Sequence, residues 1–78
     1  MKRYFELEYE GCTVRCGLST RYKHYRIHVD GEPAGWLDPA TGNVYSERAE
    51  RLGCFRRIND GVLAAAEHHI YFRKEVAQ

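Results

Sequence analysis

Residues 3–18 read RYFELEYEGCTVRCGL, and they carry the clearest structural pattern in the chain. Apolar and polar side chains alternate over residues 3–9 and again over residues 12–18. Alternation with a period of two is typical of a strand that buries one face and leaves the other in water. The stretch therefore predicts two consecutive strands with a short break between them.

A two-residue turn at Glu10 and Gly11 would join these strands as a hairpin and fix their register. In that register the apolar pairs share one face and the charged pair lies on the other, whereas a slip of one residue would mix the faces. The predicted pairs are Phe5 with Cys16, Glu6 with Arg15, and Leu7 with Val14.

A third strand is predicted over residues 22–29, and Asp30-Gly31 is a typical hairpin turn after it. A shorter strand is expected over residues 34–37, where Pro33 cannot donate a backbone hydrogen bond and so indicates a sheet edge. In the third strand, Tyr25, Ile27 and Val29 share one face, and Tyr22, His24, Arg26 and His28 share the other.

The alternation ends after Tyr45. Ser46 is a suitable N-cap for a short helix over residues 47–52, and Gly53 is placed to end that helix. Residues 54–58 fit either a strand or a helix.

Asn59-Asp60-Gly61 predicts a cap for a helix over residues 61–74. Alternation of apolar residues over 70–76 leaves a final strand as the alternative. Strands that precede helices in the chain indicate an α+β fold. We expect one domain over residues 1–78, with an antiparallel sheet of about four strands and one or two helices packed on one face.

The composition narrows the possible functions. The chain has 78 residues, which is enough for one hydrophobic core only. Its net charge is +1, so binding to phosphate would need a local basic patch. No apolar run approaches the roughly 18 residues that span a bilayer. Charges interrupt the first residues, and three cysteines are an odd number. We therefore expect a cytoplasmic protein with reduced thiols and no membrane contact.

Cys12, Cys16, His24 and His28 resemble a zinc site in their order, but only seven residues separate the pairs, where a zinc finger has about 12. On a strand, residues four apart lie about 13 Å apart, too far for two ligands of one zinc ion. The same distance excludes a Cys12–Cys16 disulfide. No nucleophile and base fall into a recognisable arrangement. We expect no metal, no cofactor and no catalytic residues, and hence a protein that is not an enzyme.

The strongest functional signal is the mixture of aromatic and basic side chains over residues 21–28. Strands of this kind bind single-stranded nucleic acid, because bases stack on the rings and cations meet the phosphates. The alternative is a solvated face on which Arg26 pairs with Glu6 or Glu8, if the first and third strands are neighbours. The expected binding residues are Arg21, Tyr22, Lys23, Arg26, Trp36, Arg56 and Arg57.

Glu6, Glu8 and Glu10 form an acidic row, which can imitate nucleic-acid phosphates or keep an exposed strand soluble. With this row, the basic strand and no catalytic signature, the chain resembles anti-CRISPR proteins, small inhibitors from phages and mobile elements, in size and habit. The resemblance implies a protein that docks on a nucleic-acid-processing protein complex and blocks it sterically and electrostatically. The alternative is a small single-stranded nucleic-acid-binding protein that uses residues 21–28. The contact face and the oligomeric state stay open.

Overall fold

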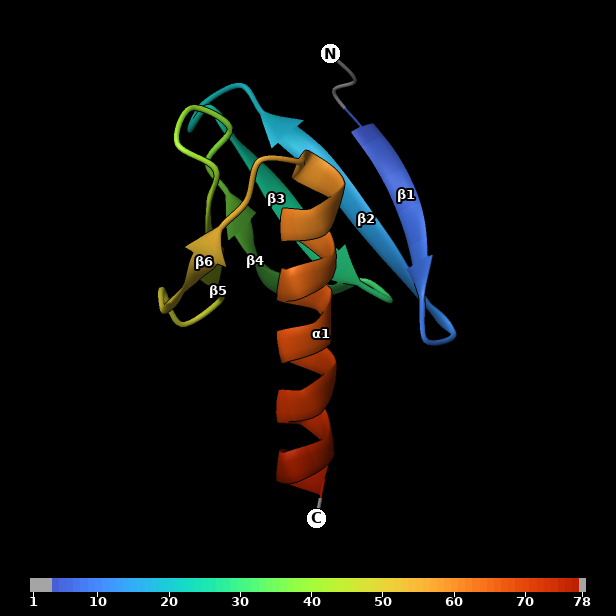
Figure 1. Ribbon diagram of the computed structural model, residues 1–78. Coiled ribbons are helices and arrows are strands. Elements are labelled where there is room, and N and C mark those ends of the chain that lie inside the picture. The colour runs from blue at the N-terminus through green and yellow to red at the C-terminus, as the bar shows by residue number, and fades with distance from the viewer. Residues whose placement is uncertain (1–3, 78) are drawn as a thin grey trace.

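The computed structural model describes residues 4–77, and their side chains as far as Phe72, as one sheet covered by one helix (Figure 1). The strands pair antiparallel in the order of the sequence. The predicted α+β class is confirmed, but the sheet has six strands rather than about four. The elements are β1 (Tyr4–Tyr9), β2 (Cys12–Ser19), β3 (His24–Val29), β4 (Glu32–Leu37), β5 (Asn43–Ser46), β6 (Arg51–Cys54) and α1 (Ile58–Ala77).

The first two predicted turns are confirmed. Glu10 and Gly11 have φ angles of 49° and 78°, and Asp30 and Gly31 have φ angles of 48° and 84°. Positive φ at both central residues matches the type I′ turn, whose twist suits a hairpin. The β1–β2 register is also the predicted one, with Phe5 opposite Cys16, Glu6 opposite Arg15 and Leu7 opposite Val14.

β4 is an interior strand, so the prediction that it forms an edge is wrong. It pairs with β3 on one side and with β5 on the other. Pro33 is tolerated because the pairing with β5 begins only at Gly35. Between the partners of Ile27 and His28, Ala34 is an extra residue, which makes a β-bulge at this point.

Residues 47–52 do not form the helix that was predicted between Ser46 and Gly53. The Ser46 hydroxyl does accept capping bonds, from two backbone N–H groups in the next four residues, each at 3.2 Å. Ala49, however, has a φ of 67°, a left-handed conformation that a right-handed helix cannot contain. The cap therefore belongs to a hairpin loop, and Gly53 lies within β6.

α1 begins at Ile58, three residues earlier than residue 61, and continues through Ala77. The helical interpretation of residues 70–76 is therefore confirmed over the alternative strand. Asp60 lies in the first turn, where its negative charge is favourable beside the positive end of the helix dipole. Within residues 4–77, no helix is long and apolar enough to cross a membrane.

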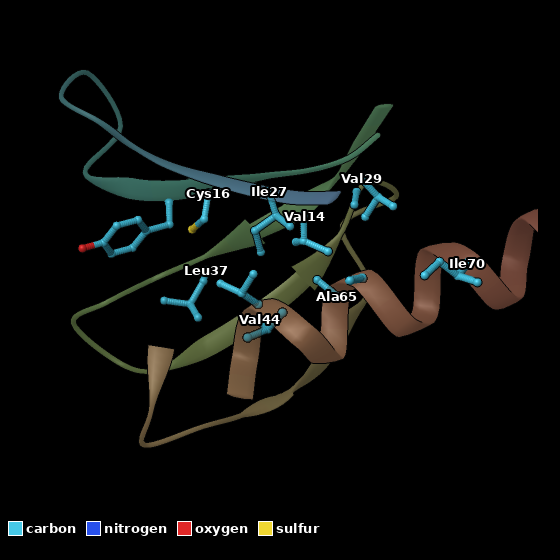
Figure 2. Close-up of a cluster of buried hydrophobic side chains, with 12 residues drawn as sticks. Val14, Cys16, Ile27, Val29, Leu37, Val44, Ala65 and Ile70 are labelled. Atoms are coloured by element: carbon cyan, nitrogen blue, oxygen red, sulfur yellow. The ribbon is translucent and has the colours of Figure 1, made fainter. Parts of the chain in front are cut away.

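The core fills the space between one face of the sheet and α1 (Figure 2). Every second residue of the strands points into it, as the alternation requires. Small residues on the helix side let α1 lie close to the sheet. The buried residues are Val14, Cys16, Tyr25, Ile27, Val29, Ala34, Leu37 and Val44 from the sheet, and Val62, Ala65, Ala66 and Ile70 from α1.

Candidate nucleic-acid interface

The face of the sheet turned away from α1, called the open face below, carries a row of stacked aromatic rings. His24, Trp36 and Tyr45 lie on strands, where they alternate along the chain with residues that point into the core. Tyr22 lies in the turn before β3. The ring centroids are 5.6 Å apart for Tyr22 and His24, 5.9 Å for His24 and Trp36, and 5.4 Å for Trp36 and Tyr45. The planes differ by 12°, 28° and 21°. These four residues form what we call the aromatic stack.

Two rings of the aromatic stack, Trp36 and Tyr45, lie on one line of cross-strand partners. Neighbouring strands are about 4.8 Å apart, close to the 5.4 Å between these two ring centroids, so each ring covers part of the other's face. His24 lies diagonally from Trp36, whose direct partner is Arg26, and Tyr22 precedes β3. The line runs through Tyr4, Gly17, Arg26, Trp36, Tyr45 and Arg51, one residue from each strand.

Arginines accompany the rings on the open face. The Arg21 guanidinium lies 5.3 Å from the centre of the Tyr22 ring. Arg26 Nη2 lies 3.5 Å from Glu47 Oε1, and the Arg26 side chain is 37% exposed. Exposed ion pairs of this kind contribute only about 0–1 kcal/mol, so another anion can replace the glutamate.

The alternative prediction that Arg26 pairs with Glu6 or Glu8 is wrong. β2 lies between β1 and β3, so Glu6 and Glu8 are two strands away from Arg26. Glu6 pairs instead with Arg15, its predicted partner on β2, at 3.4 Å. The open face is therefore salt-bridged, as expected, but through different pairs.

Gly17 leaves a hollow in the line of partners on the open face. The hollow measures about 380 Å³, and it is lined by Tyr4, Arg15, Gly17, Arg26, His28 and Gly31. A Cβ at Gly17 would lie 3.7 Å from Cδ2 of Tyr4, at ordinary contact distance. The Tyr4 hydroxyl donates a 2.8 Å hydrogen bond to Glu6, which fixes the ring at one side of the hollow. We call this feature the Gly17 hollow.

His24 lies in the middle of the aromatic stack, between Tyr22 and Trp36. Its Nε2 is buried, with no hydrogen-bond partner among the described residues. Burial lowers the pKa of His24, and the charge of Arg26 lowers it further, while Asp38 acts in the opposite direction. The folded protein therefore favours the neutral form of the ring.

The lowered pKa of His24 predicts that stability falls on acidification. Well above pH 6.5, the ordinary pKa of histidine, His24 is neutral in both the folded and the unfolded state. As the pH falls through that value, the unfolded chain takes up a proton that the folded protein resists, so unfolding becomes easier until the folded pKa is passed. We expect the free energy of unfolding in urea to differ less between about pH 7 and about pH 5 in His24→Phe than in the unaltered chain. Phenylalanine keeps a flat ring but cannot titrate. An unchanged difference would contradict this role of His24.

The expected binding residues fall into two places. Arg56 and Arg57 are exposed in the connection from β6 to α1, beside the helix start at the end of the sheet (Figure 1). The turn over residues 20–23 adjoins the open face at that same end (Figure 1). Arg21, Tyr22, Arg26 and Trp36 belong to the open face or its margin, with Lys23 in the adjoining turn.

The cysteines and histidines that resembled a zinc site lie on opposite faces of the sheet. Cys12 and Cys16 pack toward the core, whereas His24 and His28 are on the open face. Among the described side chains, no group of three or more His, Cys, Asp or Glu residues could hold a metal ion. Burial raises the pKa of Cys16 to about 12, so its thiol stays protonated and unreactive at neutral pH.

The acidic row is at the β1 edge of the open face. Glu8 accepts a 3.2 Å hydrogen bond from the Thr13 hydroxyl, and Glu6 is held by Tyr4 and Arg15. Glu10 lies in the following turn. Arg15 thus lies beside this row, whereas Arg26 and the aromatic stack lie on β3, β4 and β5 or in the turn before β3.

The open face combines flat rings, arginines in weak ion pairs and a hollow bounded by a ring and cations. No protein-family model, curated protein or solved structure matches this chain. What the open face binds is therefore inferred from the chemistry of its side chains.

Proposed function

We propose that this chain is a non-enzymatic protein that binds single-stranded nucleic acid on the open face. The observation that carries the proposal is the aromatic stack on an uncovered sheet face, accompanied by arginines. Unpaired bases offer flat faces and ring edges, and every nucleotide brings a negative phosphate. Surfaces that combine aromatic side chains with a basic groove match both features without reading sequence.

The arrangement of charges supports the same ligand. Arg21 lies over Tyr22 at one end of the aromatic stack, and Arg51 is the cross-strand partner of Tyr45 at the other. A single strand of nucleic acid laid across β3, β4 and β5 would therefore meet an arginine at each end. Phosphates would compete with Glu47 for Arg26, at a cost no larger than an exposed ion pair, about 0–1 kcal/mol.

Trp36 provides a direct test, since it is the only tryptophan in the chain and lies within the aromatic stack. We expect a single-stranded oligonucleotide of about 20 thymidines to change its fluorescence at low salt. Three phosphate contacts would give a slope of about −2 for log K against log salt, because each contributes about −0.7 on single strands. A duplex should bind more weakly, since pairing hides its bases. No fluorescence change at about 20 mM salt, where counterion release favours binding most, would contradict the proposal.

The acidic row favours a second candidate, which is docking on a nucleic-acid-processing protein complex, as the anti-CRISPR resemblance implies. Glu6 and Glu8 are exposed on an edge strand and could meet a basic partner. Tyrosine, tryptophan and arginine are also common anchors of protein interfaces. A pull-down with and without nuclease separates the candidates: a partner complex that survives nuclease supports docking, and capture that depends on nucleic acid supports direct binding.

A further inference from the structure

We propose that the Gly17 hollow holds one unpaired nucleobase between the Tyr4 ring and the Arg26 side chain, with its phosphate on Arg15 or His28. This inference rests on the proposed function and adds the position of one nucleotide to it. The open face would then bind one base in a defined place while the rest of the strand crosses the aromatic stack.

The spacing of the strands fits one flat ring. Tyr4 on β1 and Arg26 on β3 are both in line with Gly17 on β2, so they stand two strand spacings apart, or about 9.6 Å. A planar group between two stacked partners needs about 7 Å, twice the contact distance of carbon atoms. Two such groups would need more than the available width. The glycine therefore leaves room for one base.

The walls of the hollow suit a base better than the aromatic stack does. The rings of the stack cover one another, whereas within the described residues no ring stacks on Tyr4, which is 55% exposed. The hydrogen bond from Tyr4 to Glu6, and the ion pair of Glu6 with Arg15, hold that wall in place. A guanidinium is planar and stacks on aromatic rings, so Arg26 can form the opposite wall.

The charges around the hollow indicate a ligand that carries an anion. Arg15, Arg26 and His28 line it, and no carboxylate is among the residues that line it. Arg15 pairs with Glu6 and Arg26 with Glu47, but both ion pairs are exposed and contribute only about 0–1 kcal/mol each, so a phosphate can replace either glutamate. A base attached to a phosphate satisfies both the flat space and this charge, whereas an aromatic side chain of a protein partner would bring no anion.

Replacing Gly17 by valine is expected to fill the hollow and to keep the fold. A Cβ at this position meets Tyr4 at 3.7 Å, and valine is favoured in strands. We expect Gly17→Val to bind an oligonucleotide of about 20 thymidines between about 5- and 160-fold more weakly, the range of one base–aromatic stack. Its thermal unfolding temperature should be unchanged or higher. Thr13→Val changes the same face of the same strand outside the hollow, and should leave the affinity unchanged.

A second oligonucleotide of the same length without bases separates this inference from the proposed function. The unaltered chain should prefer the thymidine strand, and Gly17→Val should lose most of that preference while binding the abasic strand equally well. If both proteins keep the same preference for the thymidine strand, the hollow does not hold a base and only this inference fails. If the unaltered chain binds the two strands alike, its rings do not contact bases and the proposed function fails with the inference. If the unaltered chain does not bind the thymidine strand, the proposed function fails as well.

Discussion

Gly35→Ala is expected to lower the free energy of unfolding by about 2–4 kcal/mol, the sum of a left-handed backbone strain and an overpacked contact. Gly35 has a φ of 141°, where a side chain is strained, and it lies beside the bulge of β4. A Cβ there would stand 2.1 Å from the backbone oxygen of Tyr45 and 3.2 Å from Cα of Ser46. These are backbone atoms of β5, so the Cβ can be accommodated only if the pairing between β4 and β5 opens.

The measurement is urea unfolding followed by circular dichroism. Gly17→Ala is the matched control, because it is the same substitution in the same sheet, with a Cβ at ordinary contact distance. Its free energy of unfolding should stay within about 0.5 kcal/mol of the unaltered chain. Equal losses at Gly17 and Gly35 would show that the close approach of β5 does not restrict Gly35.

The N-terminal half of the sheet could be predicted because its information is local. Alternation over residues 3–18 defines the faces, and Glu10-Gly11 defines the register, so the pairs of Phe5 and Leu7 follow without knowledge of the rest of the chain. The same holds for Asp30-Gly31. A turn with a glycine and two patterned strands around it leaves few alternatives.

The C-terminal half could not be predicted in the same way. Ser46 makes the bonds of a helix cap, but Ala49 adopts a left-handed conformation that alanine seldom takes, so the sequence carries no signal for the β5–β6 loop. Without β5, the interior place of β4 could not be seen either. The position of Pro33 then favoured an edge that does not exist.

The residues of the candidate site could also be predicted only where the information is local. Arg21, Tyr22 and Arg26 were expected from the strand that carries or adjoins them. Tyr45 was missed, because its place in the aromatic stack depends on β5. Tyr4 and Gly17 were also missed, although the alternation of β1 and the register of β2 would have placed them on the open face.

Neutralising Arg15 and Arg26 together, as Arg15→Gln with Arg26→Gln, is expected to weaken oligonucleotide binding about 25-fold near 0.1 M salt. Each phosphate contact on single strands contributes about 0.7 to the slope of log K against log salt, or about five-fold at this concentration. The slope itself should fall by about 1.4, whereas a general loss of fold would abolish binding at every salt concentration. Fluorescence anisotropy of a labelled strand at several salt concentrations gives both quantities. Because both ion pairs are exposed, the unfolding temperature should change little.

Arg56→Gln with Arg57→Gln is the control that assigns the effect to the open face. It removes the same charge from the same chain, but at the connection before α1 rather than beside the rings. If the whole-protein field governed binding, the two double variants would weaken it equally, since the net charge falls from +1 to −1 in both. A local site on the open face requires the Arg15 and Arg26 pair to cost at least several-fold more. Equal losses would show that binding follows the net charge rather than a local site on the open face.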